Sequence, residues 1–512
     1  MKRKLKAIAA VLLVLVMLGS AMPMQLAAEA MTPPTTRYAT PDGYNDHDYQ
    51  KMVAFFEQTD ENGVRNGEKL SEDYDPTDPE TWRKYDGNYC RGTIKWTTVA
   101  GEYRLCEIFF GGRSTDAYPL ELVGFLDVSE CTALAKVRYA SFGDIQLTGL
   151  DVSGCTALEE LHCVRLSYAN YYSYNGIVEL NVSNCTALTG LDCFGNQLTE
   201  LDVSTNTGLV WLDCSGNQLT ELDVSTNAEL VRLDCSGNQL TELDISANAA
   251  LEELDCSENQ LTELDVSANT GLRTLYCSDN RLTNLDVSAN TGLRELDCSG
   301  NQLTELDVSA KAELYELDCS GNQLTELDVS TNAALYALDC SDNQLTELDI
   351  SANAALYALD CSGNQLTELD LSNNSRIDID TISAEGSGFI GVGTERDENY
   401  DFKWYCIKAV PVPGNSFCGW YAVDGTLLST NVEINRNDFD GVNDFIAKFT
   451  ASTPGGIGDV DGDGEITTYD ALLIMRYALG VETDGNELIM DFDGNGCVDA
   501  LDALLVLRRS IV

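Results

Sequence analysis

One stretch decides the fold: Leu230-Val-Arg-Leu-Asp-Cys-Ser-Gly-Asn-Gln-Leu-Thr-Glu-Leu-Asp-Ile-Ser-Ala-Asn-Ala-Ala250, which recurs every 21 residues. Nine copies follow one another in strict register, and two looser copies precede them. Their first leucines are Leu134 and Leu158, then Leu188, Leu209, Leu230, Leu251, Leu272, Leu293, Leu314, Leu335 and Leu356. Repetition at this period is typical of a solenoid, in which each repeat forms one turn and covers the apolar side of its neighbour.

The letters of the repeat predict which side chains face the core. Within Leu233-Asp234-Cys235 alternate side chains point to opposite faces, so the leucine and cysteine face inward and the aspartate faces outward. Stacked copies then form a parallel sheet with strands about 4.8 Å apart. The second apolar element, residues 243–246, is expected to line the opposite wall. Because the repeats show no helical periodicity, we expect a coil that contains few helices.

The repeat also gives its cysteines and asparagines a structural interpretation. The inward cysteines are predicted to pack as small buried hydrophobes with a raised pKa, although a redox or metal ladder is an alternative. They are Cys193, Cys214, Cys235, Cys256, Cys277, Cys298, Cys319, Cys340 and Cys361. The asparagine three residues later is predicted to turn the chain and to bond main-chain groups. Cys131, Cys155 and Cys185 replace a second asparagine, at another buried turn.

The pattern L-x-x-L-x-C-x-x-N-x-L resembles the leucine-rich repeat and covers about half of the chain. We expect the solenoid to span residues 118–377. Residues 31–117 are expected to form an N-terminal cap, with a helix near 48–58 and strands near 92–98 and 103–110. Residues 378–451 contain Phe417-Cys-Gly-Trp-Tyr421, Asp424-Gly425 and Ile446-Ala-Lys-Phe449. These segments resemble the small β-repeat that follows leucine-rich repeats in bacterial surface proteins, and a linker at 452–458 comes next. Two cysteine pairings are left open, Cys90 with Cys106 and Cys406 with Cys418.

The first thirty residues have the pattern of a secretory signal peptide. A basic segment precedes an apolar run that is too short to span a bilayer, and small residues follow it. We therefore expect a secreted, extracellular protein without a membrane span, associated with a scaffold or a cell surface. The formal net charge of −52 excludes nucleic acid as a partner, because phosphate binding needs a basic surface.

The C-terminal residues contain two calcium-loop patterns, at 459–470 and 491–502. Each places oxygen donors at positions 1, 3, 5, 9 and 12, a main-chain carbonyl at position 7 and glycine at position 6. The predicted ligands of two calcium ions are Asp459, Asp461, Asp463, Glu465, Thr467, Asp470, Asp491, Asp493, Asn495, Cys497, Asp499 and Asp502. A chance acidic turn could explain one copy, but not two copies 32 residues apart.

Each loop is followed by an apolar helical segment, and this duplicated loop–helix module at 459–512 resembles the type I dockerin. The resemblance implies an all-α, calcium-ordered fold that binds a cohesin module of a scaffolding protein, as in cellulosomes. The positions that it assigns to partner binding are Thr468, Tyr469, Arg476, Ala500, Leu501, Arg508 and Arg509. Because the two halves differ at loop positions 10 and 11, one or two binding orientations remain open.

The outward position of the sheet carries an aspartate ladder, which Tyr276 interrupts. Its members are Asp213, Asp234, Asp255, Asp297, Asp318, Asp339 and Asp360. Neighbouring carboxylates repel one another, so the ladder must be solvated, splayed, or neutralised by cations or a basic partner. It is interpreted either as a solvated face or as an acidic face that binds a protein or glycan ligand. Aromatic side chains occur near the start of their repeats at Trp211, Tyr315, Tyr336 and Tyr357. Such rings can stack on sugars, but at this spacing we expect them to pack at the rim.

The sequence favours a mainly β, non-catalytic binding protein over an enzyme. His47 and His162 are the only histidines, both are interpreted as incidental, and no nucleophile or metalloprotease motif is present. An accessory or catalytic component acting on plant polysaccharide, of the glycoside hydrolase type, is one alternative. A structural spacer whose repeats bind nothing is the other.

Overall fold

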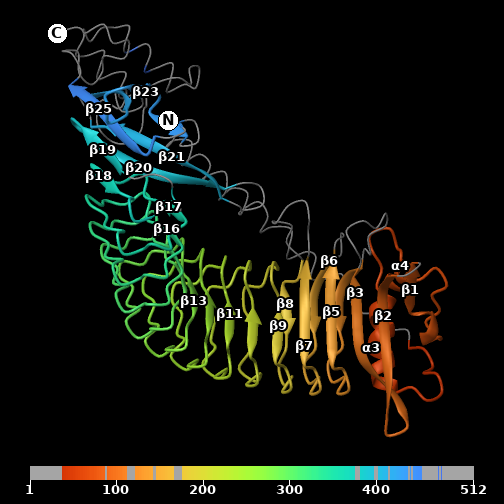
Figure 1. Cartoon of the computed structure of the whole chain (residues 1–512). Helices are drawn as coiled ribbons and strands as arrows, with labels where there is room; N and C mark the ends of the chain where they lie inside the picture. Colours follow the sequence, from red (N-terminus) through yellow and green to blue (C-terminus); the bar gives the residue numbers. More distant parts are fainter. Residues whose placement is uncertain are drawn as a thin grey trace. The chain divides into compact units, whose positions relative to one another are not determined.

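The computed structural model describes residues 37–86, 89–111, 122–141, 146–165, 176–374, 377, 381–396, 402–412, 415–435, 439, 442–451, 471 and 474. The chain divides into two compact units, one at residues 31–324 and one that contains residues 325–512. The described elements of both units are mainly strands (Figure 1), as the repeat pattern predicts. The predicted signal peptide at 1–30 and linker at 452–458 lie outside the described residues.

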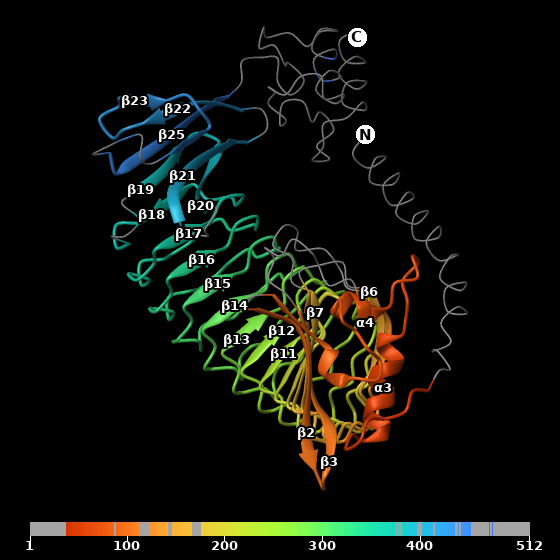
Figure 2. The ribbon, with the colours of Figure 1, turned by 90° about the vertical axis from the view of Figure 1, so that its right-hand side faces the viewer.

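The unit at 31–324 begins with a small α/β segment. It contains α3 (Asp46–Phe56), α4 (Asn66–Leu70), the short 3-10 helix η1 (Pro79–Thr81), β1 (Arg83–Asp86), β2 (Tyr89–Val99) and β3 (Glu102–Gly111). Helix α3 lies beside the long β2–β3 hairpin (Figure 2) and buries Tyr49, Met52 and Phe56. Strand β3 then pairs in parallel with the first strand of the repeats. This pairing covers the hydrogen-bonding edge that an uncapped solenoid would leave open.

The repeats of this unit form one long parallel sheet. Its strands are β5 (Lys136–Ser141), β7 (Glu160–Arg165), β9 (Gly190–Asp192), β10 (Trp211–Asp213), β11 (Arg232–Asp234), β12 (Glu253–Asp255), β13 (Thr274–Tyr276), β14 (Glu295–Asp297) and β15 (Glu316–Asp318). From β9 onward each residue pairs with its equivalent 21 residues later, for example Leu212 with Leu233. Side chains of one kind therefore stack in columns along the sheet.

The first turns carry a second parallel sheet, which the sequence did not reveal. It consists of β4 (Val123–Asp127), β6 (Gln146–Asp151) and β8 (Glu179–Asn181). Leu134, Leu158 and Leu188 are separated by 24 and 30 residues, compared with 21 in the later turns. In the later turns the same wall is lined by buried residues such as Leu243 and Ile245, as predicted.

The predicted core positions are confirmed. Leu233 and Cys235 are buried, while Asp234 between them is partly exposed. Burial raises the pKa of the Cys235 thiol well above its ordinary value, and the thiolate is the form that a metal or redox ladder would need. The inward cysteines therefore act as packing residues.

The turn asparagines connect neighbouring repeats. Asn238 donates through Nδ2 to the carbonyls of Cys214 and Cys235, both at 3.0 Å. Its Oδ1 accepts from the main-chain N–H of Leu219 at 3.0 Å. In the first turns, the cysteines that replace the second asparagine also donate to main-chain carbonyls of a neighbouring repeat. The thiol of Cys185, for example, donates to the carbonyl of Val152 at 3.0 Å. The amides and thiols thus satisfy polar main-chain atoms that the turns leave inside the coil.

The unit at 325–512 begins with two repeat strands, β16 (Ala337–Asp339) and β17 (Ala358–Asp360). Two small sheets follow. One contains β18 (Glu368–Asp370), β19 (Thr381–Glu385), β25 (Asp444–Ala451), β22 (Asn415–Tyr421) and β23 (Leu427–Ser429), and the other contains β20 (Gly388–Arg396), β21 (Phe402–Pro411) and β24 (Glu433–Asn435). The main-chain N–H of Cys361 donates to Val392 on β20 at 2.8 Å, so β20 continues the hydrogen bonding of the last repeat.

Neither open cysteine pairing forms a disulfide. Cys106 lies beside Lys95, and its thiol donates to the carbonyl of that residue at 3.3 Å. Cys90 is five residues further along β2, about 16 Å away at the rise of an extended strand, beyond the reach of a disulfide. Cys406 and Cys418 lie on strands of different sheets, and neither is in a disulfide.

Candidate functional site

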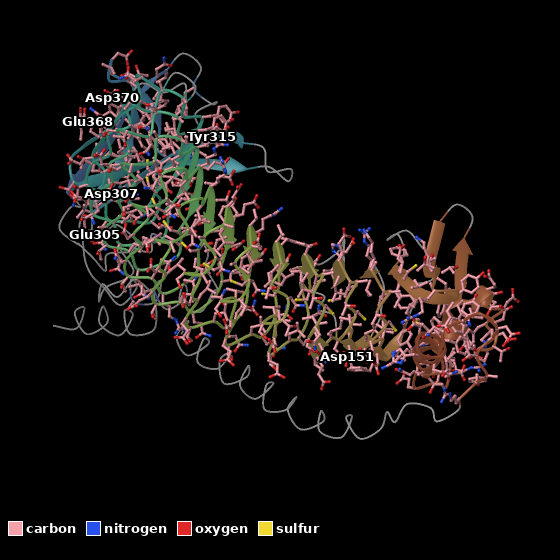
Figure 3. All side chains as sticks on the ribbon, turned by 90° about the horizontal axis from the view of Figure 1, so that it is seen from below. Asp151, Glu305, Asp307, Tyr315, Glu368 and Asp370 are labelled. Atoms are coloured by element: carbon pink, nitrogen blue, oxygen red, sulfur yellow. The ribbon has the colours of Figure 1, made fainter. Side chains whose placement is uncertain are left out.

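The solenoid carries two rows of aspartates whose pKa values are shifted in opposite directions. The first is the aspartate ladder on the strands. The second, here the rear aspartates, lies on the opposite wall and consists of Asp202, Asp223, Asp244, Asp265, Asp286 and Asp307. Figure 3 shows one of them, Asp307, on the other side of its turn from Tyr315. In both rows the aspartate accepts hydrogen bonds from the serine two residues later.

The rear aspartates have lowered pKa values. For Asp223 the cause is the hydrogen bond from the Ser225 hydroxyl, followed by the bond from the Ser225 N–H. These side chains are exposed, so little desolvation opposes the effect. The rear aspartates therefore form a solvated acidic face.

The aspartate ladder behaves differently at β10 and β12. Burial, followed by repulsion from Asp234, raises the pKa of Asp213 to about 7 and that of Asp255 to about 6. The serine bonds are present here too, with Ser215 Oγ 2.5 Å from Asp213 Oδ1, but they do not offset the burial. At Asp213 and Asp255 the ladder is therefore not a simple solvated face, which argues against that interpretation for these two residues.

Two aromatic side chains enclose this part of the ladder. Trp211 on β10 and Tyr276 on β13 stand on the outward face of the sheet, with the shorter aspartates of β11 and β12 between them. Together they form a hollow of about 250 Å³, here called the acidic hollow. It is lined by Trp211, Asp213, Arg232, Leu233, Asp234, Glu253, Leu254, Asp255, Thr274 and Tyr276.

Only partial signals of this hollow are visible in the sequence. Trp211 was expected among the aromatic residues at the repeat starts, but it lies one residue later than the row of Tyr315 and therefore on the sheet face. The ladder's break at Tyr276 marks the other wall. Trp211 and Tyr276 are each a single departure from otherwise uniform repeats. Only the parallel register of the strands shows that these two residues lie three strands apart. Of the ladder positions predicted as a binding surface, Asp234 and Asp255 line the hollow, while Asp297 and Asp318 continue the ladder beyond it on β14 and β15.

The row of Tyr336 and Tyr357 belongs to the unit at 325–512, as do Asp339 and Asp360. The two tyrosine rings stack at 5.2 Å with planes 14° apart. The two rings therefore pack on each other, as expected, while their place at a rim stays a prediction.

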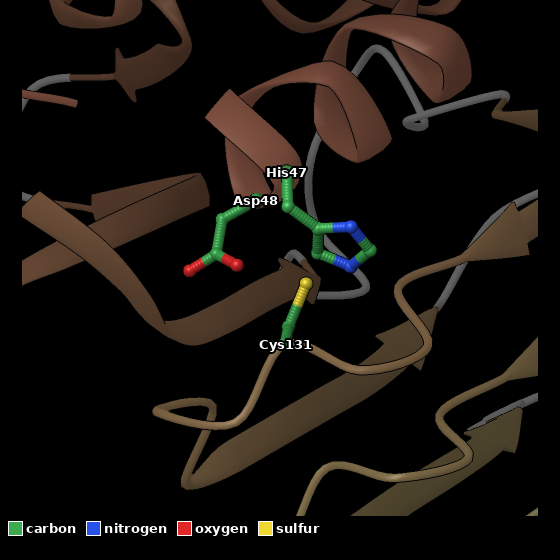
Figure 4. Close-up of side chains that lie close together, drawn as sticks. All are labelled: His47, Asp48 and Cys131. Atoms are coloured by element: carbon green, nitrogen blue, oxygen red, sulfur yellow. The ribbon is translucent and has the colours of Figure 1, made fainter. Parts of the chain in front are cut away.

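Near the N-terminus, His47, Asp48 and Cys131 come together (Figure 4) within a distance that a metal ion could bridge. Asp48 is fully buried, and its carboxylate accepts from Arg104 Nε at 2.7 Å and from the Leu105 N–H at 3.0 Å. Because a guanidinium already compensates its charge, this cluster is a buried ion pair that fixes α3 to β3. His47 is exposed, and its Nε2 atom lies 2.9 Å from the carbonyl oxygen of Ser129.

Comparison with family models identifies both kinds of module. The model described as leucine rich repeats (2 copies) matches residues 249–290 and 270–311, and the model described as dockerin type I domain matches residues 457–509. The chain is a leucine-rich-repeat protein with a C-terminal type I dockerin domain. Its dockerin implies a cohesin as partner, and dockerins of this type generally bind calcium. None of the helices in the described part of the chain is long and apolar enough to cross a bilayer.

The solved structures similar to this leucine-rich-repeat protein include internalins. The functional domain of InlJ from Listeria monocytogenes, which includes a cysteine ladder, is 38% identical, with a TM-score of 0.45, over 54% of this chain and 57% of that one. The chain thus covers a little over half of that structure. An internalin (inlF) from L. monocytogenes is 19% identical over 54% and 88% of the two chains, with a TM-score of 0.41. A Leptospira interrogans leucine-rich-repeat protein is 22% identical over 49% and 78%, with a TM-score of 0.38. A search among curated proteins found no similar sequence.

The residues predicted to bind calcium, in the loops at 459–470 and 491–502, lie outside the described residues. The same holds for the predicted cohesin contacts at 468–469, 476, 500–501 and 508–509. Their roles stay predictions.

Proposed function

We propose that this chain is a secreted, non-catalytic recognition protein. Its solenoid binds a ligand on the outward face of the sheet, and its dockerin attaches it to a cohesin on a scaffold. The observation that carries this proposal is the presence of a dockerin domain and a leucine-rich-repeat solenoid in one chain. We assign residues 1–30 to the signal peptide, 118–377 to the solenoid, 378–451 to the β domain and 459–512 to the dockerin.

Two calcium ions order the dockerin in this proposal. The loop that starts at Asp459 and the loop that starts at Asp491 offer carboxylate, hydroxyl, amide and main-chain oxygens, which are the donors that calcium prefers. The ions supply structural support, because they replace the repulsion among the acidic side chains of each loop with coordination. Partner contacts come from Thr468 and Tyr469, from Ala500 and Leu501, and from the basic residues at 476, 508 and 509.

A polysaccharide-degrading context follows from the cellulosome-type dockerin, and it raises the alternative that the chain is itself a hydrolase. Leucine-rich repeats and dockerins are binding modules, and the segments outside them are each shorter than ninety residues. A hydrolysis assay on plant polysaccharides decides this point. Product release by the purified chain would replace the recognition proposal with an enzymatic one.

The docking step is tested by capture of the full chain on immobilised cohesin, in calcium and again with a chelator. We expect capture in calcium that the chelator abolishes. Asp459→Ala combined with Asp491→Ala should abolish capture even in calcium, whereas Asp223→Asn, which removes a charge from the rear of the solenoid, should leave it unchanged. Capture that survives chelation would show that docking does not depend on the calcium loops.

A further inference from the structure

The walls of the acidic hollow are held in place by their neighbours. The indole of Trp211 lies over Gly190, where a Cβ atom would approach it to 3.2 Å. The His162 ring stands beside it, with ring centroids 5.7 Å apart. On the other side, the hydroxyl of Tyr276 donates to Glu295 at 2.5 Å. These contacts keep both aromatic walls in position above the sheet without a ligand.

The floor of the hollow presents carboxylate oxygens without donors. Asp213, Asp234 and Asp255 each accept from a serine hydroxyl and N–H through Oδ1. Within the described chain no hydrogen-bond donor reaches the Oδ2 atom of any of the three. Three acceptors therefore stand one strand apart along the floor, about 4.8 Å from one to the next.

The positively charged side chain that lines the hollow is already paired with a carboxylate. Arg232 forms an ion pair with Glu253 across the adjacent strand, with Nε 2.6 Å from Oε2. The lining residues thus supply four carboxylates and one guanidinium, so the three ladder aspartates keep an uncompensated negative charge. The raised pKa values of Asp213 and Asp255 have the same origin, since burial and mutual repulsion disfavour the ionised form.

We propose that the acidic hollow receives a lysine or arginine side chain from a basic segment of a protein partner. The cation would be held by the Oδ2 atoms of the floor and would lie against the faces of Trp211 and Tyr276, whose π-electrons attract it. This inference rests on the proposed recognition function and names the chemistry of the ligand.

A cation fits this surface better than a neutral glycan does. A sugar can stack on Trp211 and donate hydroxyl hydrogen bonds to the aspartates, but it leaves their mutual repulsion in place. A cation removes that repulsion and lowers the pKa values of the carboxylates back toward the ordinary range. Charge complementarity therefore selects the basic segment over the glycan.

The test measures binding of hexalysine to the calcium-loaded full chain by isothermal titration calorimetry at low ionic strength, with hexaglutamate and a cello-oligosaccharide as other probes. We expect hexalysine to bind and the other two not to bind. The double variant Asp234→Asn with Asp255→Asn should weaken hexalysine binding by about tenfold or more, because it removes two charge-assisted contacts. Trp211→Leu should weaken it by a smaller factor, through loss of the cation–π contact.

The matched control is Asp223→Asn with Asp244→Asn, which removes the same net charge from the rear aspartates. It should leave hexalysine binding unchanged. Equal weakening by the two double variants would show nonspecific attraction to an acidic protein, and binding of the oligosaccharide in place of hexalysine would assign the hollow to a glycan. Either result overturns the inference. Cohesin capture, measured on the same variants, stays intact in every case unless the docking proposal itself is wrong.

Discussion

Lys311 offers a sharp test of how the asparagine column holds the repeats together. It occupies the position that Asn269 and Asn290 hold in the two preceding turns, and it is fully buried. Asn290 donates through Nδ2 to the carbonyls of Val266 and Asn269, at 3.0 and 2.8 Å. The substitution Lys311→Asn would place the same donor within reach of the equivalent carbonyls one turn later, and it would remove an amine from the interior.

The magnitude follows from these two changes. Each restored amide bond contributes about 1 kcal/mol net, so two give about 2 kcal/mol. Burial lowers the pKa of Lys311, which means that the folded state disfavours its charged form. Removing the ammonium group from the interior adds a further stabilisation. This gain is partly offset, because the Oδ1 atom of the new asparagine would be buried without a hydrogen-bond donor, as Asn269 Oδ1 and Asn290 Oδ1 are. We expect Lys311→Asn to raise the free energy of unfolding by about 2–3 kcal/mol at pH 7.

The pH dependence gives this prediction a signature. A lysine whose folded-state pKa is lowered destabilises the protein fully below that pKa, and the penalty disappears as the pH rises toward the unfolded value of about 10.4. The stability difference between Lys311→Asn and the unmodified chain should therefore shrink between pH 7 and pH 10.

The assay is urea unfolding of the full chain at constant calcium, followed by far-ultraviolet circular dichroism. Lys311→Met removes the charge without adding an amide and should give an intermediate gain, while Asn290→Lys should destabilise. If Lys311→Asn is no more stable than the unmodified chain, or if its advantage is the same at both pH values, the reasoning about this column is wrong.

Three further predictions concern the solenoid. Because the folded pKa values of Asp213 and Asp255 (about 7 and about 6) exceed the unfolded value of about 3.9, the ionisation penalty present above pH 7 is relieved as the pH falls toward 5. Thermal unfolding should show Asp213→Asn gaining more stability over the unmodified chain at pH 8 than at pH 5; a gain independent of pH would contradict the assignment. The Cys235 thiol, buried and with a raised pKa, should resist iodoacetamide in the native protein and react in urea, as measured by mass spectrometry of the peptide; native labelling would refute its packing role. Asn227→Ala should cost about 2 kcal/mol in urea unfolding through loss of two amide bonds, and Asn227→Cys less, because thiols donate at this position in the first turns; equal losses would argue against the thiol bonds.

Much of the fold was predictable because the repeat is strict. A period of 21 residues with alternating side chains assigns Leu233 and Cys235 to the core and Asp234 to the surface, and the structure confirms this assignment. The helix at α3 and the strands β2 and β3 also lie where the sequence placed them. The second sheet in the first turns was missed, because the letters of its strands, such as Leu150-Asp151, recur at Leu201-Asp202, where no strand forms.

The sequence by itself determined the architecture, the solenoid with its packed cysteines and the dockerin, since each depends on local periodicity or on ligand spacing within one loop. Only the tertiary structure decided which acidic row is unusual. The aspartate ladder and the rear aspartates share the same Asp-x-Ser motif, yet burial raises the pKa in the first row at β10 and β12, while hydrogen bonding lowers it in the second. Burial, and the approach of Trp211 and Tyr276 around Asp234, depend on how successive turns stack, which no single repeat encodes.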